Sequence, residues 1–174
     1  MSTETTAGST GTTDAAGTTS TTGPAAFASP VDLLDAAGTV LGPGEWFEID
    51  QERIRRFADA TDDHQWIHLD IERATAGPFG APIAHGFLTL SLLTALATPL
   101  LDVGGLAMGV NYGFEKVRFL QPVVVGSRVR AVGTLASAER TGTGILIVQD
   151  LTVEIEGSER PALVAQWVTL LVPA

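Results

Sequence analysis

The sequence of 174 residues contains no cysteine, which excludes a disulfide framework, thiolate catalysis and cysteine-ligated metal sites. Basic residues are missing from the first part of the chain, where the first one is Arg53. Residues 1–50 carry seven acidic residues, so 13 acidic and 10 basic residues, a net charge of −3, remain for the rest. Because no basic cluster is present, nucleic acid is not an expected partner. The lack of cysteine fits a cytoplasmic protein, which is the location we expect.

A hydrophobic run long enough to cross a membrane is absent as well. The candidate "FLTLSLLTALATPLL" at residues 87–101 has 15 residues, contains Thr and Ser, and is interrupted by Pro99. Since a membrane-spanning helix needs about 20 apolar residues, this run predicts a buried core helix, and no membrane association is expected.

The first residues differ in composition from the rest. Residues 1–28 are rich in Thr, Gly, Ser and Ala, and apart from Met1 their one large apolar residue is Phe27. Such a segment cannot bury enough surface to offset the entropy of ordering. It also lacks the basic residues and the apolar run of a signal peptide. We therefore expect a disordered tail at residues 1–30, followed by one domain at residues 31–174.

The pattern of the remaining chain predicts an α+β domain. A short strand at residues 45–49 precedes a helix capped by Asp50, a second short helix capped by Asp70, and the apolar helix that starts near Gly86. Four aromatic or β-branched runs then predict consecutive antiparallel strands, at residues 111–122, 127–137, 144–157 and 162–172. We expect the sheet to wrap around the long helix, which is apolar almost all round, and an open sheet edge to favour a homodimer.

The stretch "DATDDHQWIHLDIERA" at residues 59–74 gathers five acidic residues and two histidines. One interpretation is a solvated helix end. A second is a metal site, for which the candidate ligands are Asp63, His64, His68 and Asp70. The H-x-x-x-H spacing of the two histidines converges on a metal only within a helix, whereas this stretch predicts a loop. The third is a general acid–base pair, Asp63 with His68, which could both reach one small molecule.

The residues between Asp63 and His68 favour the acid–base pair. Trp66 and Ile67 predict that part of this loop is buried, and burial shifts the proton affinities of carboxylates and imidazoles. Asp70 is then a helix cap. The other polar residues of the stretch are expected to be solvated: Asp59, Asp62, His64 and Glu72.

A second element is "PIAHGFL" at residues 82–88, where Gly86 falls in the first turn of the apolar helix. A backbone N–H at that position has no partner within the helix and could stabilise a ligand oxygen. Alternatively, Gly86 permits close packing of the helix on the sheet. We expect His85 to be a structural residue that bonds locally at the helix start.

Together, "FADATDDHQWIHLDIERA" and "GPFGAPIAHGFLTLSLL" resemble the signature of the MaoC-type (R)-specific enoyl-CoA hydratases, which have a hot-dog fold. The first match consists of Thr61, Asp63, Ile67, His68 and Asp70, and the second of Pro82, Ile83, His85 and Gly86. The stretch "NYGFEKVRFLQPVVVGSRV" also resembles a strand of this family. The resemblance extends over about residues 44–172.

The resemblance implies that Asp63 and His68 form a catalytic dyad that holds a water molecule, and that Gly86 donates its N–H to the thioester oxygen. Thr94 matches a small hydroxyl residue that braces the active-site loop from the central helix. Three residues depart from the family pattern: Asp62 for Gly, Gln65 for Asn and Trp66 for Pro. Gln65 keeps an amide that could orient the loop or the dyad. The version "DHQWIH" resembles members that are similar to nodulation protein N.

The implied activity is reversible hydration of a trans-2-enoyl thioester to the (R)-3-hydroxyacyl thioester, with no metal and no redox cofactor. The carrier would be coenzyme A or an acyl-carrier protein. Lys116, Arg118 and Arg128 are candidate phosphate contacts or ordinary surface charges. Two alternatives are a hot-dog acyl-CoA thioesterase and a non-catalytic subunit that binds acyl thioesters. The presence of both Asp63 and His68 argues against the second alternative.

Overall fold

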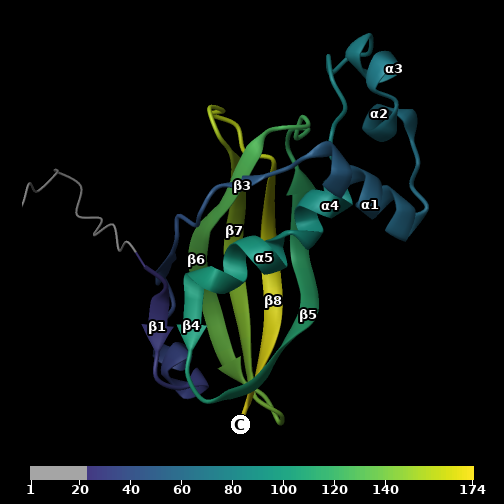
Figure 1. Cartoon of the computed structure of the whole chain (residues 1–174). Helices are drawn as coiled ribbons and strands as arrows, with labels where there is room; N and C mark the ends of the chain where they lie inside the picture. The colour runs from purple at the N-terminus through teal and green to yellow at the C-terminus, as the bar shows by residue number, and fades with distance from the viewer. Residues whose placement is uncertain (1–22) are drawn as a thin grey trace, which may run out of the picture.

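The computed structural model describes residues 23–174, and its main feature is a curved antiparallel sheet (Figure 1). The strands follow the order β2-β6-β7-β8-β5, and β3 also pairs with β6. Their bounds are β2 Val40–Leu41, β3 Phe47–Glu48, β5 Leu106–Phe119, β6 Arg128–Arg140, β7 Ile145–Ile155 and β8 Leu163–Pro173. This confirms the four long strands and the short strand that the sequence predicts.

Alternation of side chains gives the sheet one buried face. In β7 every second residue from Ile145 to Ile155 is buried, because successive strand residues point to opposite faces. Most of β8 is buried as well, as its nearly continuous apolar sequence predicts. The buried face of both strands packs against the central helical segment.

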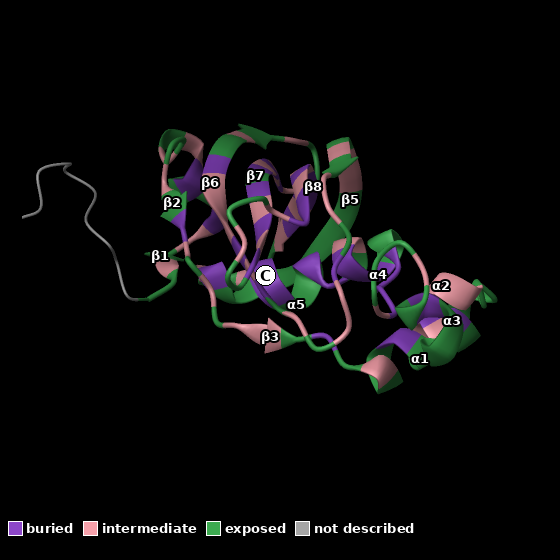
Figure 2. Cartoon of the chain, turned by 90° about the horizontal axis from the view of Figure 1, so that it is seen from above, coloured by how far each residue is buried: buried purple, intermediate pink, exposed green. Residues whose placement is uncertain are grey.

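This central segment is divided into α4 (Gly86–Ser91), α5 (Leu93–Ala97) and a 3₁₀ turn, η2 (Thr98–Leu100). Figure 2 shows α5 beneath the curved sheet, and its buried residues Leu93, Leu96 and Ala97 belong to the same core cluster as Leu151 and Val153 of β7. The expected single apolar helix is therefore a chain of short helical pieces. It is also less completely buried than predicted, since Phe87, Ser91 and Thr94 are exposed. No helix of residues 23–174 is long and apolar enough to span a membrane.

The N-terminal segment corrects the predicted extent of the tail. Strand β1 (Ala25–Phe27) pairs in parallel with β4 (Leu101–Val103), and a 3₁₀ helix, η1, spans Pro30–Asp35. Leu33 of η1 is fully buried and belongs to a core cluster with Leu135. The last part of the predicted tail is therefore packed structure, while residues 1–22 lie outside the described part of the chain.

Three short helices, α1 (Gln51–Thr61), α2 (Trp66–Leu69) and α3 (Ile71–Thr75), form a separate layer beside the sheet (Figure 1). Asp50 caps α1 and Asp70 caps α3, each accepting a hydrogen bond from the backbone N–H three residues later, which confirms both predicted caps. Ile54 and Ala58 form the buried face of α1. This layer contains most of the residues that the sequence marks as reactive.

Both ends of the helical layer are held by one loop of the sheet. Before the layer, Ile49 exchanges backbone hydrogen bonds of 2.9 and 2.8 Å with the segment Gly126–Ser127. After the layer, the carbonyl oxygen of Pro82 accepts a 2.9 Å hydrogen bond from the N–H of Val125. The layer therefore leaves the sheet and returns to it at the same place.

Candidate active site

The site begins where helix α1 ends. Asp62, its C-cap, adopts the left-handed conformation with φ 56°. A left-handed residue is a common way to end a helix, and glycine adopts this conformation with the least strain. This position is therefore physically suited to the glycine that the family pattern has there, and the turn directs the chain into Asp63.

His68 lies on α2, a single helical turn rather than the loop that the sequence predicts. Its ring is buried, with 6% of the residue exposed, and its Nδ1 lies 2.6 Å from the carbonyl oxygen of Ile83. A carbonyl oxygen only accepts hydrogen bonds, so Nδ1 carries the proton and donates it. In the neutral ring, Nε2 is then left with a free lone pair that can take a proton.

Burial lowers the pKa of His68 below its usual value of 6.5. The hydrogen bond to Ile83 and the charge of Asp63 oppose this shift, whereas His85 adds to it. Removing water from a charged imidazolium is the dominant effect, because the ring is nearly enclosed by protein. His68 is therefore neutral at physiological pH, as a general base must be.

His85 is the residue whose position the sequence did not predict. Its ring stacks on that of His68, with centroids 3.7 Å apart and planes inclined by 25°. Its Nε2 donates to the carbonyl oxygen of Asp63 across 2.9 Å, and lies 4.0 Å from the Asp63 carboxylate. The expected local bonding at the helix start is wrong for this ring, which instead connects the helix to a residue 22 positions earlier. The sequence feature that could have indicated a role in the site is the match of His85 to the "PIAHG" segment.

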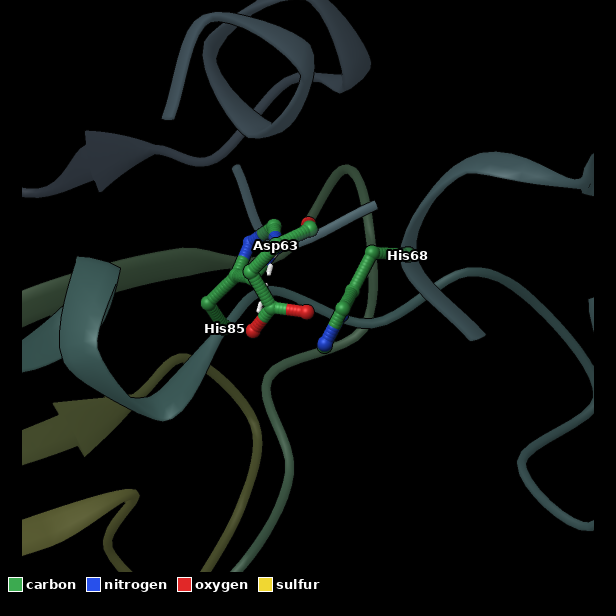
Figure 3. Close-up of side chains that lie close together, drawn as sticks. All are labelled: Asp63, His68 and His85. Carbon is green, nitrogen blue, oxygen red and sulfur yellow. Dashed lines mark hydrogen bonds and ion pairs between the residues drawn. The ribbon is translucent and has the colours of Figure 1, made fainter. Parts of the chain in front are cut away.

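The side chains of Asp63, His68 and His85 gather in one place (Figure 3), where the ring tip of His68 points toward the Asp63 carboxylate. One polar atom from each residue lies within 4.8 Å of those of the other two. Two acceptors at this separation can both hydrogen-bond to one water molecule, because each such bond is about 2.8 Å long. The arrangement can therefore hold and deprotonate a water molecule.

Gly86 is the first residue of α4 and borders a pocket of about 410 Å³ next to His68. The pocket is mostly apolar and is lined by Ile67, His68, Ile83, Ala84, Gly86, Thr89, Phe119, Leu120, Gln121, Pro122, Val123 and Ala162. A Cβ at Gly86 would lie 3.3 Å from the ring of Phe119, so glycine keeps this part of the pocket open. The structure thus brings Gly86 and His68 to one pocket.

Two predicted supporting residues lie differently from what was expected. The side chain of Gln65 is exposed, and its backbone N–H donates weakly to the Asp63 carboxylate across 3.4 Å. Thr94 borders a different cavity, on the other half of the central segment. The hydroxyl at the pocket is that of Thr89, which is buried and donates to the carbonyl oxygen of His85 across 3.4 Å.

Asp63, His68 and His85 together form a group that could contain metal ligands. A metal ion binds in the plane of an imidazole ring, along the lone pair of its nitrogen. Because the two rings are stacked, their in-plane lone pairs are directed along separate, roughly parallel planes and do not converge as tetrahedral coordination requires. The geometry suits a bound water better than a shared ion.

The remaining charged candidates lie outside this cluster. His64 is exposed and pairs with Asp59 across 3.0 Å, a hydrogen bond that raises the pKa of His64. Arg128 pairs with Glu156 across 3.1 Å, which makes it a poor candidate for a phosphate contact. Arg118 is exposed and donates to its neighbouring backbone carbonyl.

A family model described as "MaoC like domain" matches residues 32–155. The chain belongs to this family. The match confirms the resemblance that rests on the two motifs. Asp63, His68 and Gly86 all lie within the matched region.

Relatives and solved structures agree with this assignment. The chain is 52% identical over 141 residues to 3-hydroxyacyl-thioester dehydratase Z of Mycobacterium tuberculosis H37Rv, covering 80% of this chain and 93% of that protein. It is 47% identical to nodulation protein N of Rhizobium leguminosarum bv. viciae, covering 82% and 91%. The fold is similar to that of an R-hydratase from Pseudomonas aeruginosa, with a TM-score of 0.65 at 20% identity, covering 79% and 83%. The predicted hot-dog fold is confirmed.

Proposed function

We propose that this protein catalyses the reversible hydration of trans-2-enoyl thioesters to (R)-3-hydroxyacyl thioesters. The observation that carries the proposal is the neutral, buried His68 beside the Asp63 carboxylate, at a pocket that Gly86 borders. The name of the 52% identical relative, a 3-hydroxyacyl-thioester dehydratase, supports the same chemistry in the reverse direction.

In the hydration direction, a water molecule donates one hydrogen bond to the Asp63 carboxylate and the other to Nε2 of His68. Nε2 takes the proton of this second bond as the water oxygen attacks C3 of the enoyl group. The electron pair of the C2–C3 double bond then forms a C1–C2 double bond, and the pair of the carbonyl double bond moves onto the thioester oxygen, which gives an enolate. The His68 imidazolium then delivers its proton to C2 on the same face, so that water has been added in full.

The backbone N–H of Gly86 stabilises the negative charge on the thioester oxygen. This N–H lies in the first turn of α4, where helical N–H groups have no partner within the helix. Loss of one such donor costs about 3 kcal/mol of transition-state stabilisation in other enzymes. The reaction so described needs no metal and no redox cofactor.

The deciding experiment uses crotonyl-CoA with two readouts in one cuvette, the enoyl absorbance and a thiol reagent. Hydration predicts loss of enoyl absorbance without release of free thiol, and the chirality of the product then tests the R configuration. Release of free thiol would instead establish the thioesterase alternative. If neither signal changed, with crotonyl-CoA and with a crotonyl acyl-carrier protein, both enzymatic assignments would be wrong and a binding subunit would remain.

A homodimer is part of the proposal. Strand β5 ends the sheet order, and large apolar side chains on it are exposed: Met108, Val110, Tyr112 and Phe119. An unpaired apolar edge of this length favours pairing with a second copy. Sedimentation should give twice the mass of one chain, and Tyr112→Lys should shift the protein toward the monomer, whereas Thr143→Lys, on an exposed turn, should not. A monomeric wild-type protein would contradict this prediction.

Two further predictions remain open. The carrier is coenzyme A or an acyl-carrier protein, and comparing the two crotonyl thioesters at equal concentration distinguishes them. A cytoplasmic location rests on composition alone, and fractionation of the producing cells tests it.

A further inference from the structure

A second cavity, of about 340 Å³, lies between the central helical segment and the buried face of the sheet. The residues that line it are Thr94, Ala97, Thr98, Leu101, Val103, Leu106, Gly109, Asn111, Ile147, Gln149, Trp167, Thr169 and Leu171. None of these side chains carries a charge, yet five of them are hydroxyl or amide side chains. Thr94, Thr98 and Asn111 are exposed and border the open side of the cavity, whereas Gln149 and Thr169 are buried at its inner side.

The polar side chains form a band across three neighbouring strands. Asn111 of β5 is paired with Thr169 of β8, and Gln149 of β7 is paired with Trp167 of β8. This band separates the two apolar clusters of the core, one containing Leu151 and the other Ile147. The band therefore interrupts the apolar face at the position of the cavity.

Two members of the band are buried: Thr169 has a hydroxyl without a partner, and Gln149 lines the cavity. Thr169 is 9% exposed, and its hydroxyl oxygen has no hydrogen-bond partner among the described residues. Gln149 is 3% exposed, and its amide makes none of the side-chain hydrogen bonds found within residues 23–174. In contrast, Asn111 accepts a 2.8 Å hydrogen bond from the indole N–H of Trp167. Buried polar groups without partners are rare and point to a bound polar group.

The catalytic pocket and the cavity both border the central helical segment. On the central segment, Gly86 borders the pocket and Thr94 borders the cavity. Eight helical residues correspond to about 12 Å, a distance that an extended medium-chain acyl group covers. An acyl chain with its thioester at Gly86 could therefore extend its far end into the polar band.

We infer that Gln149 and Thr169 select acyl thioesters with a neutral hydrogen-bonding group, a hydroxyl, keto or amide, near the far end of a medium-length chain. This inference rests on the proposed hydratase activity and adds the substrate class. A plain alkyl chain offers no hydrogen bond to the unpartnered Thr169 hydroxyl or to the Gln149 amide at the cavity, which a site built for hydrogen bonding penalises. A carboxylate is disfavoured because no cationic side chain lines the cavity.

The test compares three medium-chain trans-2-enoyl-CoA substrates of equal length: one unmodified, one with a terminal hydroxyl and one with a terminal carboxylate. The wild-type enzyme should have at least a roughly tenfold higher kcat/KM for the hydroxylated substrate than for either of the others. Gln149→Leu and Thr169→Val should reverse this preference in favour of the unmodified chain. Thr152→Val, on the same strand but outside the cavity, should leave it unchanged.

Thermal unfolding provides a second measurement. Thr169→Val has nearly the same shape and removes an unpaired buried hydroxyl, so its Tm without substrate should equal or exceed that of the wild type. Equal kcat/KM for hydroxylated and unmodified chains in the wild type would overturn the inference. So would an unchanged preference in both variants. If neither crotonyl thioester nor any of the three medium-chain substrates is hydrated, the proposed function fails, whereas hydration without preference defeats only the inference about the cavity.

Discussion

The helical layer α1–α3 and the sheet differ in how far their side chains are buried and in whether they supply reactive groups. The sheet is built mainly from four long strands, of which β7 and β8 have a largely buried inner face whose polar exceptions line a cavity. The helical layer consists of short pieces with exposed ends, yet it supplies Asp63 and His68. Short, well-anchored segments often carry reactive groups while a rigid scaffold positions them. Substitutions in the layer should therefore affect chemistry, and substitutions in the sheet should affect stability or selectivity.

The largest expected effect is on chemistry in the layer. Asp63→Asn and His68→Gln should each lower kcat for crotonyl-CoA hydration by at least about 10³-fold, because the first removes the negative charge that holds the water and the second removes the base. Their free energies of unfolding should stay close to that of the wild type. His64→Gln and Asp59→Asn, which change the exposed pair nearby, are matched controls and should keep full activity. Near-wild-type rates in the dyad variants would refute the assignment of Asp63 and His68.

The opposite effect is expected in the sheet. A Cβ at Gly133 would collide with the carbonyl oxygen of Asp150 on the neighbouring strand. Gly133→Ala should therefore lower the free energy of unfolding by about 3 kcal/mol. The variant molecules that are folded should have the same kcat as the wild type. Gly142→Ala is the control, since its Cβ would meet no atom within 4 Å. Denaturant unfolding measures the effect. A Gly133→Ala variant that is stable but inactive would contradict the expectation that substitutions in the sheet affect stability or selectivity rather than chemistry.

The pH dependence of hydration tests the roles of the two stacked histidines, His68 and His85. Because burial lowers the pKa of His68 below 6.5, the neutral ring persists at and above pH 6.5, and kcat/KM for hydration should fall only as the pH drops through the lowered pKa. Stability follows the same direction, since protonating the buried ring at low pH favours unfolding. His85 adds to this lowering, so His85→Gln should move the acid limb upward and lower activity by about tenfold. An unmoved limb would show that His85 only supports the fold.

The smallest expected effect concerns the end of α1. Asp62 is left-handed, and a β-branched side chain tolerates that conformation poorly. Asp62→Val should lower the free energy of unfolding by about 1–2 kcal/mol, while Asp62→Gly should not lower it. Equal stabilities of the two variants, measured by denaturant unfolding, would contradict the role given to this backbone conformation.

Local signals made much of the structure predictable. A cap such as Asp50 bonds three residues ahead, and alternation along β7 is visible within one strand, so both could be inferred from neighbouring letters. The resemblance marked Asp63, His68 and Gly86, two of which meet at one pocket. By contrast, the ring of His85 bonds 22 residues away, and β1 pairs with a strand far along the chain. Contacts of this range leave no periodic pattern, and three small or aromatic residues such as Ala25–Phe27 carry little strand signal.

The return of the helical layer to its starting point has an evolutionary consequence. Ile49 and Pro82 are both held by residues 125–127, so the segment between them is an excursion with adjacent ends. Such a segment can be replaced in one piece without rerouting the strands. Members of the family could therefore exchange residues 50–81 as a cassette, and chimeras joined at Ile49 and Pro82 would separate the inheritance of Asp63 and His68 from that of Gly86 and the sheet.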